Sequence, residues 1–350
     1  MPALTADAVK AAALRVGFSK VGVARAGPLD PGPLDRMLAR GGEADMAWLR
    51  TQREARLDPR RVLPGAESVV ALALSYHAGE SPPTPRWARE VARYARGRDY
   101  HAVMKRKLRA LVAEIAALDA SARTWAGCDI GPIMERAWAQ RAGIGWVGKN
   151  GCLITPEFGS WVLLAAVLVD RPLAPDAPHP ERCGTCAACL AACPTGAIPE
   201  PGLVDARRCL SYWTIERRGE IPAEMAARLG RWAFGCDDCQ TCCPWNDGLA
   251  ASVDPELTAN PGQWALDLDA LLALTEEDFR RRYHGTALAR ARHDGLVRNA
   301  LLQAGLSGEA RHLPAVRALR ASPHAGVRAA AEWAEAQLAT AEGRTTGHDP

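Results

Sequence analysis

Residues 183–194 read C-G-T-C-A-A-C-L-A-A-C-P, a run of cysteines that ends in Cys-Pro. Two residues separate each of the first three cysteines from the next, and three residues separate the third from the fourth. This spacing is typical of proteins that bind two [4Fe–4S] clusters, in which three cysteines hold one cluster and the fourth reaches the other. We therefore expect an iron–sulfur module in the middle of this chain.

A second cluster needs further cysteines, and the chain supplies them downstream. The stretch 236–244 reads C-D-D-C-Q-T-C-C-P, and Cys209 precedes it. Cys242 is left over in this scheme and competes with its neighbour Cys243 as a ligand. We assign Cys183, Cys186, Cys189 and Cys243 to the first cluster, and Cys193, Cys209, Cys236 and Cys239 to the second.

Zinc and disulfides are the alternative uses of these cysteines. Zinc sites usually combine two separated CxxC pairs or mix cysteine with histidine, so the first run fits a cubane cluster better. Disulfide frameworks suit short secreted chains, whereas this chain has 350 residues and opens with M-P-A-L-T-A-D-A-V-K, which lacks the apolar core of an export signal. The apolar run 161–169 is much shorter than the ~20 residues of a membrane span. We expect a soluble, cytoplasmic monomer without a membrane partner.

Strand and helix patterns alternate in the first half of the chain. This alternation predicts a mixed α/β unit at 1–175, and the proline-rich stretch 171–180 links it to an iron–sulfur segment at 176–250. The expected strands are 19–26, 68–76 and 161–169, and the expected helices are 5–16, 105–118 and 132–142.

The last part of the chain is predicted to be helical. A connecting segment at 251–284 includes a helix start at Thr275, which precedes E-E-D. Helical stretches at 296–304, 313–319 and 327–338 predict a HEAT-like unit at 285–340, and such helix pairs need a neighbour to bury their apolar faces. The polar residues 341–350 predict a disordered tail.

Basic residues gather in two stretches, although the net charge is only +3. Residues 86–109 hold nine Lys and Arg against two acidic residues, and 280–298 hold six Arg against one. Such clusters suit a surface that follows phosphates, but they equally suit a solvated helix face. Charge alone leaves both interpretations open.

Several motifs together resemble the epoxyqueuosine reductase family. They are Y-A-R-G-R-D-Y-H at 94–101, C-D-I-G-P-I-M-E-R-A-W-A-Q-R-A-G-I-G-W-V-G-K-N at 128–150, both cysteine runs, and Y-W-T-I-E-R-R-G at 212–219. The helical end, with V-R-N at 297–299, is similar to the longer form of the family. The resemblance implies an α+β protein: a nitroreductase-like α/β domain that binds cobalamin, a ferredoxin-like module with two [4Fe–4S] clusters, and a C-terminal HEAT-like repeat.

The resemblance also implies a reaction on tRNA. Epoxyqueuosine at the wobble position would be reduced to queuosine, and the epoxide oxygen would leave as water. Cobalamin fed by the clusters would supply the electrons, because no side chain does so at the required potential; the electron donor stays unidentified. The leaving oxygen needs a proton donor, which the resemblance places at Asp129 with a pKa raised by burial. From the residues alone, Asp129 could instead cap the helix expected at 132.

Further site residues follow from the same motifs. His101 is expected to contact the corrin or the substrate rather than cobalt. The alternative functions are a corrinoid iron–sulfur reductase of a small molecule, similar to reductive dehalogenases, and a non-catalytic electron-transfer module. The cobalamin candidates are Arg53, Tyr94, Arg98, Asp99, Tyr100, His101, Asp129, Ser211, Asp237 and Asp238, and the tRNA candidates are Arg217, Arg218 and Arg298.

Overall fold

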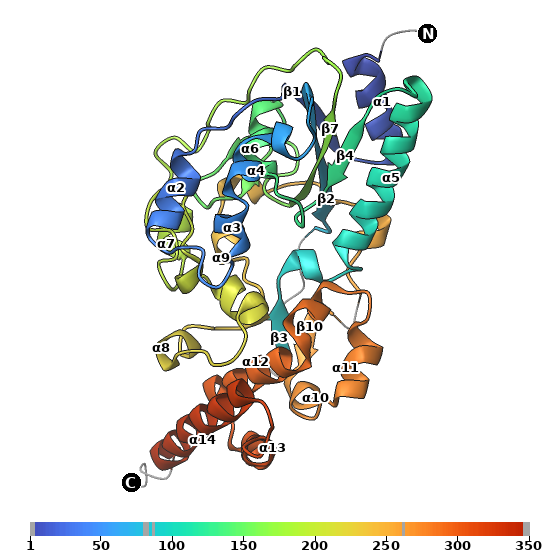
Figure 1. Cartoon of the computed structure of the whole chain (residues 1–350). Coiled ribbons are helices and arrows are strands. Elements are labelled where there is room, and N and C mark those ends of the chain that lie inside the picture. Colours follow the sequence, from blue (N-terminus) through green and yellow to red (C-terminus); the bar gives the residue numbers. More distant parts are fainter. Residues whose placement is uncertain (1–3, 80–83, 86–87, 261–262, 346–350) are drawn as a thin grey trace.

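An antiparallel sheet in the N-terminal half organises the fold in this computed structural model, which describes residues 4–79, 84–85, 88–260 and 263–345. The strand order is β1-β2-β7-β4 (Figure 1), and the register pairs β9 with the end of β2. All of these pairs are antiparallel, which confirms the α+β class. The strands are β1 Lys20–Arg25, β2 Ser68–His77, β4 Thr124–Gly127, β7 Val162–Val169 and β9 Ser252–Val253.

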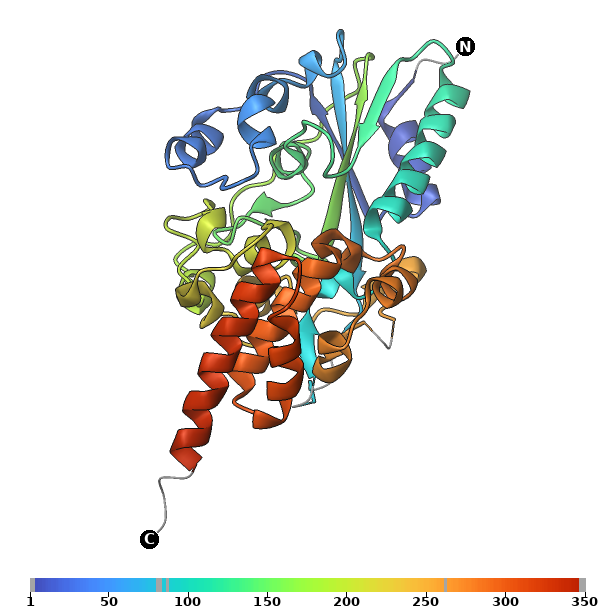
Figure 2. The same cartoon turned by 60° about the horizontal axis from the view of Figure 1, so that its bottom comes forward.

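Strand β2 is buried along its whole length because helices cover both faces of the sheet (Figure 2). Its even-numbered residues from Val70 to Tyr76 pack with α1 and α5, and its odd-numbered residues from Val69 to Ala73 pack with α2 and α6. Successive residues of a strand point to opposite faces, so this strand reads as a continuous apolar run. The helices here are α1 Ala6–Val16, α2 Gly32–Ala39, α3 Trp48–Thr51, α4 Arg53–Leu57, α5 Tyr100–Leu118 and α6 Glu135–Arg141.

Capping side chains explain where the helices begin. Thr5 caps α1, as predicted, by accepting a hydrogen bond from the backbone N–H of Ala8 at 3.2 Å. Helix α5 begins earlier than predicted because Asp99 caps it and accepts from the backbone N–H of His101 at 3.0 Å. Helix α6 begins at Glu135, after the predicted start at 132, and no side chain caps it.

A second sheet contains strands from three of the segments that the sequence predicts as separate domains or connections. Strand β3 pairs in parallel with β8 and antiparallel with β10, and one hydrophobic core continues from these strands into the C-terminal helices. The boundaries near 175, 250 and 284 therefore do not separate the hydrophobic cores, and the division into domains stays a prediction. The elements are β3 Ala88–Val91, β8 Trp232–Phe234, β10 Ala265–Asp267, α10 Leu268–Leu272, α11 Glu276–Tyr283, α12 Arg292–Ser307, α13 Leu313–Leu319 and α14 Ala325–Thr345.

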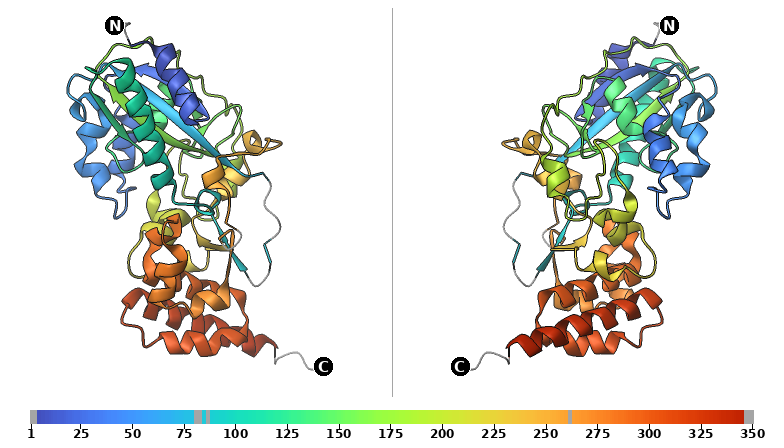
Figure 3. Two further views of the ribbon diagram at one scale, coloured as in Figure 1. Left: turned by 90° about the vertical axis from the view of Figure 1, so that its right-hand side faces the viewer. Right: turned by 90° about the vertical axis from the view of Figure 1, so that its left-hand side faces the viewer.

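The predicted C-terminal helices are confirmed as α12, α13 and α14. Figure 3 shows them at the end of the molecule opposite the large sheet. Thr275 caps α11, as predicted, by accepting from the backbone N–H of Asp278. Helix α14 continues to Thr345, so the predicted disorder from 341 is wrong up to that residue, and 346–350 lie outside the described residues. No helix in the described part of the chain has both the length and the apolarity of a membrane span.

The cysteine region consists of short elements. Helices α7 and α9 lie within the two cysteine runs and pack against each other. Strands β5 and β6 form a hairpin around the glycine-rich turn at 148–151. The elements are β5 Trp146–Val147, β6 Leu153–Ile154, α7 Ala188–Ala192, a π-helical turn at Tyr212–Glu216, α8 Ala223–Ala226 and α9 Asp238–Thr241.

Arg298 ties helix α12 to the segment 213–219. It is only 2% exposed, and its guanidinium donates to the backbone carbonyls of Trp213, Arg217 and Gly219 at 2.8–2.9 Å. Burial lowers the pKa of Arg298 to about 10, so it still carries its charge at neutral pH. The prediction that Arg298 contacts tRNA is therefore wrong, because its donors are used inside the protein.

We expect Arg298→Met to lower the free energy of unfolding by on the order of 3 kcal/mol, because buried carbonyls lose their donor. Urea unfolding followed by tryptophan fluorescence measures the change. Arg320→Met is the matched control, since Arg320 is 51% exposed and pairs with Glu335 at the surface, where an ion pair contributes at most ~1 kcal/mol. Equal losses in both variants would contradict the role of Arg298.

Candidate functional site

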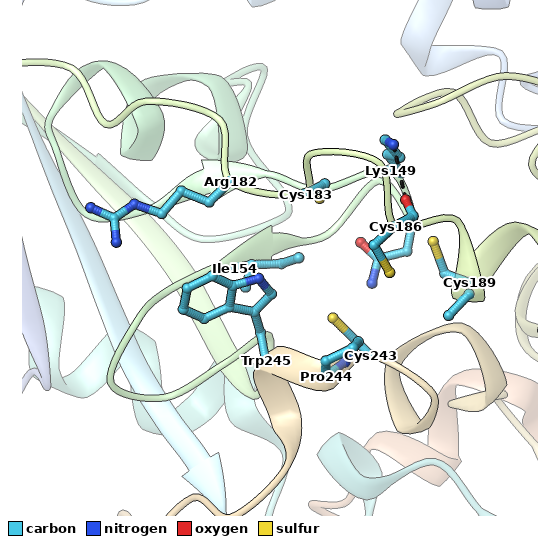
Figure 4. A pocket seen from close by; sticks show the side chains of 11 residues that line it. Lys149, Ile154, Arg182, Cys183, Cys186, Cys189, Cys243, Pro244 and Trp245 are labelled. Atoms are coloured by element: carbon cyan, nitrogen blue, oxygen red, sulfur yellow. Dashed lines mark hydrogen bonds between the residues drawn. The ribbon is translucent and has the colours of Figure 1, made fainter.

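The cysteines assigned to the first cluster line one cavity of about 200 Å³. Cys183, Cys186 and Cys189 come from the first run, and Cys243 reaches the cavity from the second run. Figure 4 shows the sulfur atoms of Cys186, Cys189 and Cys243 turned toward the same space. The set of thiol donors around one cavity fits a [4Fe–4S] cluster.

The cysteines assigned to the second cluster form a separate electrostatic group. Cysteines of this group lie close enough to raise the pKa of their neighbours electrostatically. Cys193 does so for Cys209, Cys209 for Cys236, and both Cys209 and Cys236 for Cys239. Burial raises the pKa of Cys209, Cys236 and Cys239, and a bound metal would favour their thiolate forms. Within the described ranges, no group of three or more Cys, His, Asp or Glu side chains is placed to hold a single metal ion.

The structure separates the roles of the adjacent Cys242 and Cys243. Cys243 is 8% exposed and lines the first cavity, whereas the thiol of Cys242 donates to the carbonyl of Cys239 at 3.7 Å. Cys242 nevertheless lies close enough to Cys186 and Cys189 to interact with them electrostatically. The arrangement favours Cys243 as the ligand and leaves Cys242 as its nearest substitute.

A second cavity, of about 280 Å³, opens beside the second group of cysteines. Cys152 in its wall interacts electrostatically with Cys239, and Tyr94 and Tyr100 come from the motif singled out in the sequence. Arg136 and Gln240 come from the 128–150 motif and the second cysteine run, whereas the other lining residues lie largely at or near strand ends and no motif marks them in the sequence. They are Tyr76, Leu153, Ser160, Val162, Leu163 and Leu164.

Asp129 stands beside this cavity on a strained loop. Its carboxylate accepts a hydrogen bond from the hydroxyl of Tyr100 at 2.7 Å and lies 3.2 Å from Nε2 of His101. Its φ of +62° belongs to a region that side-chain-bearing residues rarely adopt, and Glu135 accepts from its backbone N–H at 2.8 Å. Since its side chain caps no helix, the capping interpretation of Asp129 is wrong.

Hydrogen bonds keep Asp129 ionised. The bond to His101 lowers the pKa of Asp129, even though burial acts in the opposite direction. Burial by itself would lower the pKa of His101, but hydrogen bonds to Asp129 and Asp99 outweigh it and raise that pKa to about 9. At neutral pH the proton therefore resides on His101, and the raised pKa expected for Asp129 is not found.

Two charged residues that the sequence did not single out interact with Asp129: Arg56, which is buried, and Glu135, which is half-buried. Burial raises the pKa of Glu135 to about 7. Arg56 is 6% exposed and interacts electrostatically with both Glu135 and Asp129. Arg53, the candidate from the same stretch, instead binds both carboxylate oxygens of Asp35 at 2.6 and 2.7 Å and lines neither cavity, so its contact with cobalamin stays a prediction.

The other cobalamin candidates occupy three different surroundings. Arg98 is 68% exposed and pairs with Glu256, so the structure does not bring it into the second cavity. Asp99 caps α5 and holds the ring of His101. The remaining candidates flank the second cysteine group: Ser211 hydrogen-bonds Cys209, Asp237 accepts from the backbone N–H of Arg93 at 2.7 Å, and Asp238 pairs with Arg231.

The tRNA candidates other than Arg298 differ in accessibility. Arg217 has a 34% exposed side chain and pairs with Asp45. The guanidinium of Arg218 donates to the carbonyls of Ile215, Arg290 and Ala291 and helps to hold the segment before α12. Of these candidates, Arg217 is therefore better placed than Arg218 to meet a ligand from solution.

Comparison with known proteins identifies the family. Residues 182–246 match the family model of a 4Fe-4S double cluster binding domain, and residues 56–129 match that of Epoxyqueuosine reductase QueG, DUF1730. The chain is 45% identical over 278 residues to the epoxyqueuosine reductase of Gloeobacter violaceus, which covers 78% of this chain and 86% of that protein. The chain belongs to the epoxyqueuosine reductase family. The Xanthomonas campestris enzyme is 37% identical over 308 residues, with 86% of each chain covered.

Solved epoxyqueuosine reductases share the fold over nearly the whole chain. A selenomethionine-labelled enzyme matches with a TM-score of 0.87 and 33% identity, covering 97% of this chain and 92% of the other. A complex with an epoxyqueuosine-modified tRNA-Tyr stem loop matches at 0.86 and 32%, covering 98% and 94%. The Bacillus subtilis enzyme, solved with its catalytic aspartate loop swung out of the active site, matches at 0.86 and 32%, covering 95% and 90%. The iron–sulfur prediction is thus confirmed, and zinc and disulfides are disfavoured.

Cys243→Ala should lower the iron content of reconstituted protein from about eight to about four atoms per chain, because the first cluster loses a ligand. Cys242→Ala is the matched control, with the same change one residue away, and it should keep both clusters. Chemical iron and sulfide analysis measures the difference. If Cys242→Ala loses iron and Cys243→Ala does not, the assignment of the second run is wrong.

The protonation of His101 should make stability depend on pH. Its pKa is raised from 6.5 to about 9 in the folded protein, so its contribution is complete below pH 6.5 and is lost as the pH rises through about 9. The free energy of unfolding of the native protein should therefore fall relative to that of His101→Gln across this range. Urea titrations at several pH values test this, with the exposed His324→Gln as control. Parallel curves for the native protein and His101→Gln would show that the ion pair is absent.

Proposed function

We propose that this chain reduces epoxyqueuosine at the wobble position of tRNA to queuosine and releases the epoxide oxygen as water. The observation that carries the proposal is the position of Asp129 beside a cavity that adjoins the second cysteine group. Protons would reach the substrate from one side of this cavity and electrons from the other. Family membership supports this function, as does the relative that was solved with an epoxyqueuosine-modified tRNA stem loop.

Cobalamin is the cofactor that we propose for the second cavity. The tyrosines Tyr76, Tyr94 and Tyr100, with the apolar start of β7, make a wall that suits the face of a flat macrocycle. Bound cobalamin would supply a strongly reducing, nucleophilic metal centre, which no side chain offers. Of the candidates predicted from the sequence, Tyr94, Tyr100, His101 and Asp129 lie at or beside this cavity, and Ser211, Asp237 and Asp238 lie beside the second cysteine group.

Asp129 and His101 act as one proton-donating unit in this proposal. His101 holds the proton at rest, and its hydrogen bond to Asp129 gives the proton a short path to the carboxylate. Asp129 then delivers it to the oxygen that leaves the epoxide, a transfer that general acids perform. Asp99 fixes the imidazole through its contact with Nδ1 at 2.9 Å, and Tyr100 orients the carboxylate.

Electrons would enter through the first cluster. Cys186 is exposed, whereas Cys239 of the second group interacts with Cys152 in the wall of the second cavity. The order from donor to substrate is therefore first cluster, second cluster, cobalamin. The donor itself is unidentified.

Exposed residues near Asp129 and Arg217 form the surface that we propose for tRNA. Ile130 is 81% exposed beside Asp129 and suits an apolar contact with the anticodon loop, and Arg217 suits a phosphate. We also propose that 1–175 has a nitroreductase-like fold and that 285–340 forms a HEAT-like repeat. The protein would be a monomer, and a cytoplasmic location would fit a tRNA substrate. The small-molecule alternative is not favoured, because the curated relatives named above are epoxyqueuosine reductases.

The direct test incubates reconstituted protein with a low-potential reductant and epoxyqueuosine-tRNA, followed by mass analysis of the nucleosides. We expect loss of one oxygen and formation of queuosine. An organohalide substrate run in parallel separates the alternative. Turnover of the organohalide without turnover of the tRNA would reverse the assignment.

Asp129→Asn should keep both clusters and cobalamin but lose about 10²–10⁴-fold in single-turnover rate, because the amide cannot deliver an acidic proton. Pre-reduced enzyme isolates the chemistry from electron supply. Asp35→Asn is the matched control, since Asp35 is a surface aspartate bound to Arg53, and it should react at the native rate. A native rate in Asp129→Asn would exclude Asp129 as the essential donor.

A further inference from the structure

Trp146 makes a hydrogen bond to one of the cluster cysteines. Its indole N–H donates to Sγ of Cys183 at 3.4 Å, and its side chain has no exposed surface. Nothing in the sequence distinguishes it from an ordinary core tryptophan. We propose that Trp146 raises the reduction potential of the first cluster through this N–H···S hydrogen bond, and the proposal rests on the electron-entry role given to that cluster above.

The surroundings of Trp146 fix the direction of its N–H group. The residue lies on β5, and its ring stacks on His179 with centroids 5.2 Å apart and an angle of 28°. Trp245, which closely follows Cys243, packs edge-on against it at 4.8 Å and 74°. A ring held on two sides cannot turn its N–H away from the sulfur without repacking, so the hydrogen bond is built into the core.

Other buried tryptophans show that this bond is not a general consequence of burial. The indole N–H groups of Trp138, Trp161 and Trp232 are also buried, yet they find no hydrogen-bond partner within the described part of the chain. The N–H of Trp146 instead meets the sulfur of a cluster ligand. The contrast indicates that the position of Trp146 is specific to the cluster site.

The effect on the potential follows from charge. Reduction adds negative charge to a cluster and its thiolate sulfurs, so a donor aimed at one sulfur stabilises the reduced form more than the oxidised form. Lys149 acts in the same direction, because its ammonium lines the same cavity and donates to the carbonyls of Gly184 at 2.6 Å and Cys186 at 2.9 Å. Loss of the indole N–H should therefore make the first cluster harder to reduce.

The test is a redox titration of the reconstituted full-length chain, followed by the EPR signals of the two reduced clusters. Trp146→Phe keeps an aromatic ring but removes the N–H, and it should shift the midpoint potential of one cluster to a more negative value and leave the other unchanged. Trp138→Phe is the matched control. Trp138 is as deeply buried as Trp146, but its indole N–H has no hydrogen-bond partner among the described residues and it does not line the cluster cavity, so both potentials should stay at their native values.

Replacement of Trp146 by 3-benzothienylalanine separates the hydrogen bond from packing, because this residue keeps the shape of the indole and has sulfur in place of N–H. It should reproduce the negative shift even if Trp146→Phe incorporates less cluster. An unchanged potential in the benzothienyl variant, or an equal shift in Trp138→Phe, would overturn the proposal. The potential is read without tRNA, so a negative shift in a protein that fails to reduce epoxyqueuosine would refute the proposed function and leave this inference standing.

Discussion

Cys243 lies in the same cavity as cysteines of the first run, although about fifty residues of chain separate them. This contact is the constraint on which the rest of the site depends, because a cluster bound there holds the two cysteine runs at a fixed separation. A cluster bound by Cys193, Cys209, Cys236 and Cys239, which interact electrostatically, would impose a similar constraint on the second group. Helices α7 and α9, which lie within the two cysteine runs, pack against each other and keep the runs side by side. The wall of the second cavity, with Cys152 and Gln240, is in turn fixed beside the second group.

The C-terminal helices also help to hold the segments that carry the cysteines of the second group. Arg298 and Asn299 on α12 donate to backbone carbonyls at 213–219 and at Ala233, all in the stretch between Cys209 and Cys236. A buried guanidinium is stable only when its donors are satisfied, and here backbone carbonyls satisfy them. One hydrophobic core joins β3 and β8 to α12 and α14, so these helices stabilise the segments around the site. A separate RNA-binding domain would not share this core. The helical end is better described as part of the framework that holds the site.

The acid–base side of the site shows how several carboxylates avoid mutual repulsion. Asp99 and Asp129 share one imidazolium, which offsets their negative charges within a small space. Glu135, by contrast, is half-buried, and desolvation raises its pKa to about 7, so it is only partly charged at neutral pH while it accepts from the backbone N–H of Asp129. These contacts stabilise the positive φ of Asp129, a conformation that is uncommon for side-chain-bearing residues but that aspartate tolerates better than most.

The sequence by itself determined the chemistry of the protein, because cluster binding depends on the spacing of cysteines along the chain. It also determined the buried strands and the helix starts at Thr5 and Thr275, which depend on neighbours in sequence. Only the tertiary structure decided the roles of the arginines: Arg56 and Arg298 are buried, whereas Arg53 and Arg98 are drawn to carboxylates at the surface. The same holds for the proton, which the sequence placed on Asp129 and the structure places on His101. Burial, partner identity and pKa depend on which residues distant in sequence come into contact, and no local pattern encodes that information.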